Sequence, residues 1–152
     1  FSSWSLEEFH DVTTAMADAA ERAMRRLDIA HLAERPLGAL SSGEARRVTI
    51  ARALVNAPRA LVFDEPSTSL DLAGRREVRD SMRALARSGV SIVLVTHQLE
   101  EVIPEIDRVV LLAHGRVCAD GPKADVFTRE RLGDLFGVAL DLDVRDGYYS
   151  AR

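Results

Sequence analysis

The stretch PLGALSSGEARRVTIARALVNAPRALVFDEPSTSLD, from Pro36 to Asp71, decides the fold. Ser41 followed three residues later by Glu44 is the capping-box pattern of a helix start, so we expect a helix from Ser41 to about Asn56. Pro58 prevents its continuation. The apolar run ALVFDE that follows predicts a buried parallel strand with two acids at its tip.

Working outward toward the C-terminus, the same alternation repeats. DLAGRREVRDSMRALARSG predicts a helix that ends at Gly89, and VSIVLVTH predicts a second buried strand with a polar tip. Alternating strands and helices predict an α/β sheet with helices on both faces. RVVLLAHGRVCADG then predicts a hairpin that turns at His114 and Gly115.

The two ends of the chain are predicted separately. Apolar residues at spacings of three and four predict an amphipathic helix from Ser5 to Leu27, with a capping box at Ser5 and Glu8. Two short helices are expected after Pro122, ending near Phe136. Residues 138–152 are either an alternating strand pair that turns at Asp146-Gly147 or a loose tail.

Composition excludes several classes of protein. The 152 residues are 47% hydrophobic and 29% charged, as in a globular domain, and the net charge of −4 argues against broad attraction to nucleic acid. No apolar run approaches the roughly 20 residues that span a bilayer. The chain starts at Phe1, which we interpret as the edge of a longer protein, with a processed mature start as the alternative.

Two segments carry the chemistry of phosphate groups. At Ser41, Ser42, Gly43 and Glu44, a helix start with small residues offers backbone N–H groups and a positive dipole end, which suits a phosphate if Gly43 faces outward. The alternative is a well-capped structural helix. Farther along the chain, beyond the helix, Asp64 and Glu65 close the first strand. They suit a magnesium ligand and a base for water, or else two acids that open a solvated turn.

Asp71 and His97 complete the set of candidates. Asp71 stands at the start of the helix predicted after the first strand, where its simplest role is that of an N-cap. His97 ends the second strand, where it faces the ligand crevice of an open α/β sheet, although a lone histidine is more often structural. The candidate site therefore requires that Asp64, Glu65 and His97 converge at one rim of one sheet.

In this order the segments resemble the C-terminal part of an ABC-type ATP-binding subunit, from Ser5 to Gly137. LSSGE resembles the signature motif LSGGQ, ALVFDE the Walker B strand, SLD the D-loop and VTH the H-loop. The resemblance implies a partial P-loop NTPase (RecA-like) sheet plus an α-helical subdomain. It divides the chain into a helical subdomain (5–56), the C-terminal half of the ATPase core (57–137) and a tail (138–152).

The resemblance also implies roles for these residues in hydrolysing ATP with Mg²⁺. Asp64 would hold Mg²⁺ through water, Glu65 would activate the attacking water, and His97 would contact the γ-phosphate. The implied partners are a second ATP-binding subunit and a transmembrane permease at the cytoplasmic face of a membrane, with no nucleic acid. The residues implied to act across that subunit interface are Ser41, Ser42, Gly43 and Glu44, which touch the partner's ATP, and Asp71, which couples the two sites.

Three departures from the family pattern matter. Ser42 replaces a glycine of the signature motif, and Glu44 replaces its glutamine with a negative charge near phosphate. The phosphate loop G-x-x-x-x-G-K-[ST] does not occur in this sequence, and the family order places it before Phe1. Losing three charge-assisted hydrogen bonds costs roughly 4.5 kcal/mol, or about a thousandfold in affinity. We therefore expect that the chain alone neither binds ATP tightly nor hydrolyses it.

In the family the phosphate-loop strand lies between the SIVLVT and RVVLLA strands, so we expect these two not to pair here. Their free edges would favour dimerisation, rearrangement or aggregation. Two other functions remain open for the sequence. One is an ABC-type ATPase that acts on DNA or ribosomes. The other is a truncated regulatory module that completes the ATP site of a partner subunit through Ser41–Glu44.

Overall fold

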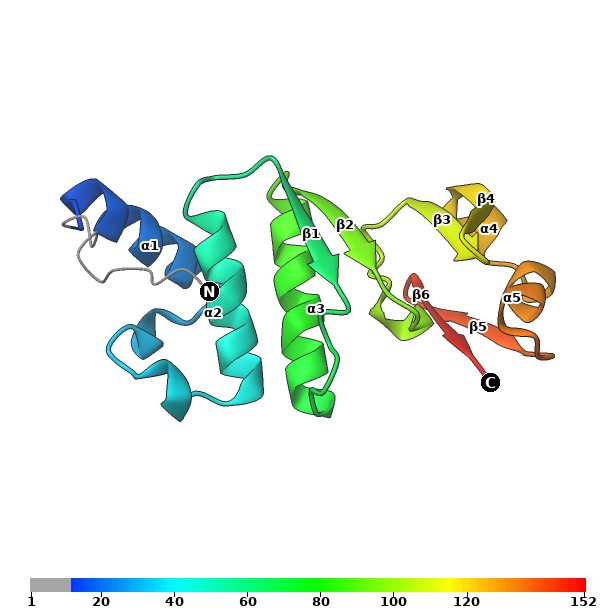
Figure 1. Ribbon diagram of the computed structural model, residues 1–152, viewed down its shortest axis with the longest axis horizontal. Helices are drawn as coiled ribbons and strands as arrows, with labels where there is room; N and C mark the ends of the chain where they lie inside the picture. Colours follow the sequence, from blue (N-terminus) through cyan, green and yellow to red (C-terminus); the bar gives the residue numbers. More distant parts are fainter. Residues whose placement is uncertain (1–11) are drawn as a thin grey trace, which may run out of the picture. The chain divides into compact units, whose positions relative to one another are not determined.

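The computed structural model describes residues 12–152, which divide into two compact units between Pro58 and Arg59 (Figure 1). The first unit contains the helices α1 (Thr14–Arg26) and α2 (Ser42–Leu54), joined by the short 3₁₀ turns η2 (Ala30–Leu32) and η3 (Leu37–Ala39). α1 and α2 pack together through apolar side chains. The buried ones are Ala23, Leu27, Ile29, Leu32, Ile50, Ala51 and Leu54.

Hydrogen bonds at their N-caps set where both helices of this unit begin. The Thr13 hydroxyl accepts from the backbone N–H of Met16 at 3.3 Å, so this helix begins at Thr14. The prediction of one helix running from Ser5 to Leu27 is wrong, because Val12 and Thr13 are not helical. The capping box predicted at Ser5 and Glu8 lies outside the described residues. The one predicted for α2 is confirmed: Glu44 N–H donates to Ser41 Oγ at 3.2 Å, and Ser41 N–H donates to Glu44 Oε2 at 2.7 Å.

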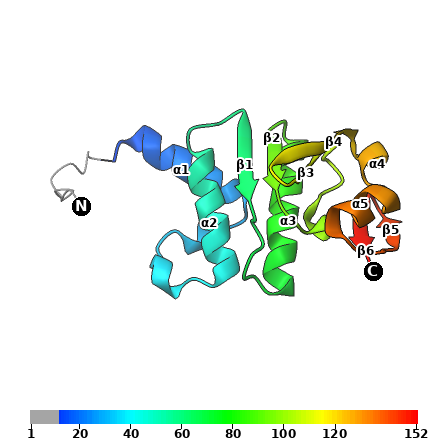
Figure 2. The same cartoon turned by 45° about the vertical axis from the view of Figure 1, so that its right-hand side comes forward.

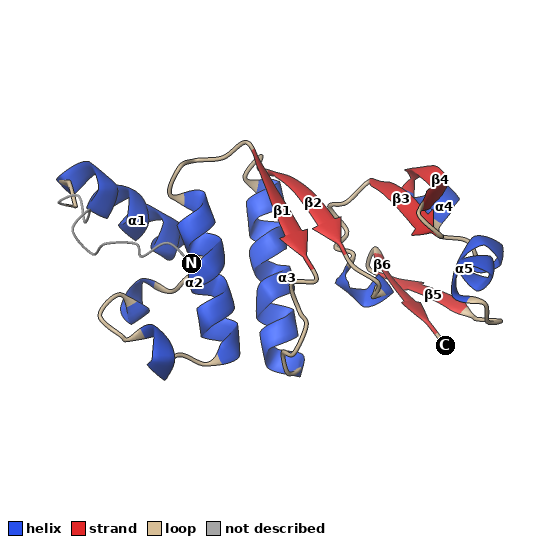
Figure 3. Ribbon diagram, viewed as in Figure 1, coloured by secondary structure: helices blue, strands red, loops and turns tan. Residues whose placement is uncertain are grey.

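The second unit begins with a parallel strand pair and its crossover helix (Figure 3). β1 (Ala60–Asp64) and β2 (Ser91–Val95) pair in register from Ala60 opposite Ser91 to Asp64 opposite Val95. α3 (Leu72–Arg87) joins them and packs against β2. As predicted, α3 ends just before Gly89, whose φ of +89° is a left-handed conformation that favours glycine.

The expectation that both strands are fully buried is wrong. Leu61 and Phe63 of β1 are buried, but the alternate residue Val62 is 70% exposed. Val93, its partner in β2, and Val95 are about half exposed on the same face. Side chains alternate between the faces of a sheet, and only one face of this pair is packed against the unit's core.

The remainder of the second unit is built from two hairpins and two short helices. β3 (Arg108–Ala113) and β4 (Arg116–Pro122) turn at His114 and Gly115, as predicted. α4 (Lys123–Val126) and α5 (Arg129–Phe136) confirm the two short helices. β5 (Leu142–Arg145) and β6 (Tyr148–Ala151) form the strand pair that was one of the two alternatives for the C-terminal segment. Figure 2 shows these elements gathered at the C-terminal end of the chain.

The β5–β6 hairpin is part of the core of the second unit. Tyr149 is buried with its ring edge against Phe127, at 5.1 Å between ring centroids, in an arrangement typical of aromatic pairs. The other buried members of this cluster come from the 3₁₀ turn η4 (Leu99–Glu101) and from elements β3 to α5. They are Leu99, Val102, Leu111, Val126 and Leu132.

The strands of the described residues form three separate two-stranded sheets, β1–β2, β3–β4 and β5–β6. β2 and β3 therefore do not pair, as expected. The segment between β2 and β3 is instead attached to α3 through Glu105, which precedes β3. Both oxygens of Glu105 accept from Arg83 Nε at 3.0 Å, and Oε1 also accepts from Arg87 Nε at 2.8 Å.

Glu105 is expected to stabilise the protein above acidic pH. Burial raises the pKa of its carboxyl, but hydrogen bonds, including those from Arg83 and Arg87, outweigh burial and leave the pKa below its ordinary value. A group with a lowered folded-state pKa stabilises above the unfolded-state value, near 4.5, and loses that contribution as pH falls through the folded-state pKa. The Glu105→Gln variant should therefore lose roughly 1–2 kcal/mol at pH 7, and the difference should shrink under acid.

Urea unfolding of both proteins at pH 7 and under acid measures this difference. Asp120→Asn is the matched control, because it breaks a comparable pair, Arg108–Asp120, that lies on the exposed surface. A smaller loss is expected for this control at pH 7. An equal loss for both variants, or a Glu105→Gln loss independent of pH, would contradict the assignment.

The α2 cap yields a second expectation. Ser41→Ala removes the acceptor for the N–H of Glu44 and should lower the free energy of unfolding by about 1 kcal/mol. Ser41→Asp supplies another capping oxygen and should retain most of the stability. Thermal unfolding followed by circular dichroism at 222 nm compares the two variants, and equal midpoints would show that this cap does not support α2.

Candidate functional site

The parallel register of β1 and β2 brings Glu65 and His97 together. Glu65 follows directly after β1, and its backbone N–H donates to the carbonyl of Val95 at 2.9 Å, which extends the strand pairing by one bond. His97 lies two residues beyond the end of β2. Parallel strands end at the same edge of a sheet, so both side chains lie at one rim. The convergence predicted for these two residues is therefore found in the structure.

The two side chains form a close polar pair. His97 Nδ1 lies 2.6 Å from Glu65 Oε1, which is hydrogen-bond distance for any tautomer that places a proton between them. The side chain of His97 is 71% exposed and that of Glu65 is 34% exposed. A carboxylate held by a histidine at a solvent-facing rim can accept a proton from a water molecule beside it.

Backbone strain accompanies the pair. Glu65 has φ of 44° and Ser69 has φ of 66°, both in the left-handed region that non-glycine residues rarely occupy. Hydrogen bonds hold the intervening turn: Thr68 N–H donates to Glu65 O at 3.2 Å and Leu70 N–H donates to Ser67 O at 3.1 Å. Strained residues persist where the surrounding structure fixes them, and they cluster at functional sites.

Asp64 is exposed at the end of β1, opposite Val95 and next to Glu65 in the chain. Among residues 12–152, no group of three or more His, Cys, Asp or Glu side chains is placed to hold a metal ion. Mg²⁺ in phosphate-transfer sites commonly takes one or two carboxylates, several waters and phosphate oxygens. A single exposed carboxylate at this rim therefore fits the chemistry of a magnesium ligand.

Asp71 is the N-cap of α3, its simplest predicted role. Its Oδ1 accepts from the N–H of Gly74 at 2.8 Å. A Cβ at Gly74 would approach that oxygen to 3.1 Å, so the small residue leaves space for the cap. Asp71 thereby anchors the turn that begins at Glu65 to the start of α3.

The signature-like segment belongs to the first unit and is described by itself. Ser41 and Ser42 are exposed, but Gly43 is buried, contrary to the expectation that Gly43 faces outward. Gly43 is the second residue of α2 and lies on the packed side of the helix. Hydrogen bonds from the backbone and side chain of Ser41 lower the pKa of the Glu44 carboxyl, and Arg35 lies 3.5 Å from it. Glu44 is thus a charged capping residue.

The sequence interpretation missed a series of arginines along α3. At intervals of four residues these side chains contact the segment between β2 and β3 in order: Arg75 contacts Gln98, Arg79 contacts Glu100, and Arg83 and Arg87 contact Glu105. Residues four apart share one helix face. The four-residue spacing of the arginines is visible in RREVRDSMRALAR, but no neighbouring residue in the sequence indicates which loop they contact.

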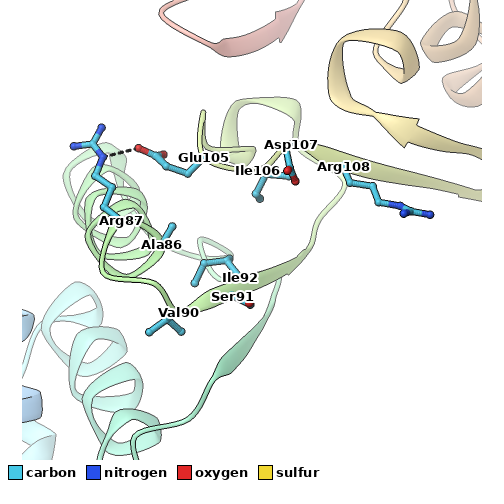
Figure 4. Close-up of a pocket in the computed structure, with 9 residues that line it drawn as sticks. All are labelled: Ala86, Arg87, Val90, Ser91, Ile92, Glu105, Ile106, Asp107 and Arg108. Carbon is cyan, nitrogen blue, oxygen red and sulfur yellow. Dashed lines mark hydrogen bonds and ion pairs between the residues drawn. The ribbon is translucent and has the colours of Figure 1, made fainter.

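A cavity of about 350 Å³ lies at the opposite end of β2 from His97 (Figure 4). It is lined by the end of α3, the start of β2 and residues 105–108, with the Arg87–Glu105 pair at one side. The first residues of β2 and the first residue of β3 both line this cavity. None of the candidate residues from the sequence lines it.

Comparisons with known proteins identify relatives of the chain. The family model described as ABC transporter matches residues 2–68. The chain is 40% identical over 126 residues to the hemin import ATP-binding protein HmuV of Rhodococcus jostii, covering 83% of this chain and 43% of that protein. It is 43% identical over 123 residues to the molybdenum import ATP-binding protein ModC of Mycobacterium tuberculosis, covering 80% and 33%. The chain thus spans less than half the length of these relatives.

Solved structures show the same fold. The structure of cbiO1 from Clostridium perfringens, part of the ABC transporter complex cbiONQ, is 32% identical with a TM-score of 0.68, over 76% of this chain and 47% of that one. A structure described as a metal-chelate type ABC transporter in an inward-facing conformation is 26% identical with a TM-score of 0.83, over 95% and 59%. Fold, motifs and relatives together show that the chain belongs to the ABC transporter family, as the C-terminal part of an ATP-binding cassette domain.

Proposed function

We propose that this chain forms part of the ATP-hydrolysing subunit of an ABC transporter, and that its site residues act as the family motifs imply. The observation that carries the proposal is the 2.6 Å contact of Glu65 with His97 at the common rim of β1 and β2. Relatives named as hemin and molybdenum import proteins favour an importer over an exporter. The acidic net charge gives no support to nucleic acid as the partner.

Each residue at the rim has a distinct part in the proposed reaction. Glu65 accepts a proton from a water molecule, whose oxygen then attacks the terminal phosphorus of ATP as ADP leaves. His97, with its ring largely exposed beside that carboxylate, contacts the oxygens of the transferred phosphoryl group. Asp64 would hold Mg²⁺ through water, and a bound ion would supply neutralisation of the charge on the phosphates.

The first unit would serve a neighbouring subunit. Ser41 and Ser42, which are exposed, would contact phosphate through their hydroxyls, whereas Gly43 is buried. Ser41 Oγ accepts from Glu44 N–H and retains its own proton for donation. One proposed partner is a second ATP-binding subunit, whose ATP Ser41 and Ser42 contact and with which Asp71 couples. The other is a transmembrane permease. None of the described helices is long and apolar enough to cross a membrane. We place the subunit at the cytoplasmic face of the membrane, bound to that permease.

The 152-residue chain by itself should not bind ATP tightly. Its sequence lacks the phosphate-loop motif, and β2 and β3 lie in separate sheets where the family places the phosphate-loop strand between them. Isothermal titration with Mg-ATP is therefore expected to show no binding with a Kd below about 100 μM. Micromolar binding by this chain would contradict the proposal that tight ATP binding requires the phosphate loop.

In the complete protein, Glu65→Gln should lower kcat for ATP hydrolysis by about 100-fold or more, because it removes the general base. Binding of ATP should be nearly unchanged, since the carboxylate acts on the water. Steady-state phosphate release and equilibrium ATP binding separate the two effects. Glu130→Gln, an exposed acid on α5, is the matched control and should retain wild-type kcat. Retention of kcat by Glu65→Gln would remove Glu65 from the mechanism.

A further inference from the structure

One side chain touches both loops that carry the Glu65–His97 pair. Arg75, in the first turn of α3, donates from Nε to the carbonyl of Leu70 at 3.1 Å and from Nη1 to Gln98 Oε1 at 3.2 Å. Leu70 belongs to the hydrogen-bonded turn that begins at Glu65, and Gln98 directly follows His97. Both contacts are partly buried, where competition from water is reduced.

The loop around His97 is also fixed from the other side. Thr96 Oγ1 accepts from Gln98 N–H at 3.0 Å and is hydrogen-bonded to Glu101 Oε2. Glu101 is only 3% exposed, so its carboxylate is held within the fold. With Thr96 anchored and Gln98 held by Arg75, the backbone on both sides of His97 is constrained. A displacement of Gln98 should therefore also displace His97, which contacts Glu65.

We propose that Arg75 is a positioning residue that couples the Glu65–Asp71 turn to the Thr96–Gln98 loop and so sets the alignment of Glu65 with His97. The planar guanidinium presents donors in fixed, diverging directions, and a lysine ammonium cannot reproduce that fork. The consequence for ATP hydrolysis rests on the proposed function. The coupling itself is a property of the fold and is testable without nucleotide.

The neighbouring arginines show why this role differs from general support of the fold. Arg79, Arg83 and Arg87 already attach α3 to the segment between β2 and β3. Their hydrogen bonds go to Glu100 and Glu105, between β2 and β3, rather than to the turn that follows β1. Losing one contact of Arg75 should therefore disturb the alignment of the two loops more than it disturbs stability.

The test uses NMR of the isotopically labelled 152-residue chain. Gln98→Ala removes the acceptor on the loop side and leaves α3 and the Arg75–Leu70 contact intact. If Arg75 transmits position, the backbone amides of Ser69 and Leu70 should shift in Gln98→Ala, although the substitution lies 28 residues away in sequence from Leu70. In the Arg75→Lys background the same substitution should no longer shift these amides, which is the signature of coupling through Arg75.

The His97 ring provides a second readout. In Glu65→Gln the contact between the side chain of residue 65 and the His97 ring is altered, so this variant gives the ring resonances of a disturbed pair. The proton and carbon resonances of the His97 ring in Arg75→Lys should move toward those values. Arg76→Lys is the matched control, because Arg76 is the next residue on α3 and its contact with Asp80, at 3.9 Å, lies on the exposed surface. It should leave the amides of Ser69 and Leu70 and the His97 ring unchanged.

Two outcomes would overturn the proposal. One is that Gln98→Ala leaves Ser69 and Leu70 unshifted while Arg75 is present. The other is that it shifts them equally in the Arg75→Lys background. Since no nucleotide enters the measurement, either result removes the coupling and leaves the proposed ATPase function standing. Conversely, a complete protein that fails to hydrolyse ATP would leave the coupling measured in this chain intact.

Discussion

The parallel pairing of β1 with β2 is the constraint on which the rest of the structure depends. The two strands are separated by 26 residues of turn and helix, yet their register places Glu65 and His97 at one rim. A slip of one residue would turn alternate side chains to the opposite face and separate the pair. The bond from Glu65 N–H to Val95 O continues this register to the point where the acid leaves the strand.

α3 supplies the second constraint. Asp71 caps its start and Gly89 follows its end, so that its length matches the crossover between the strands. Its arginines then contact the segment between β2 and β3 at four successive turns. The helix is therefore more than a cover for one sheet face, because it determines where the polar loops at the rim lie.

The sequence predicted best those features that local chemistry determines. The Ser41 capping box, the cap at Asp71 and the turns at His114-Gly115 and Asp146-Gly147 follow from a few adjacent residues, and the structure contains all of them. Burial depends on neighbours distant in sequence, which explains why Gly43 and Val62 were predicted wrongly. The contacts of Arg75 and Arg83 were missed for the same reason: the spacing on the helix was evident, but the loops that they meet were not.

At Glu65, the backbone conformation and the side chain favour different residues. A residue at φ of 44° is strained when it carries a side chain, and glycine would adopt this conformation without that cost. Glycine would also delete the carboxylate beside His97. Under the proposed function this position is a stability–activity trade-off, because the substitution that relaxes the backbone also removes the acid. Selection for thermostability alone would favour glycine at this residue and so remove the carboxylate that the proposed reaction uses.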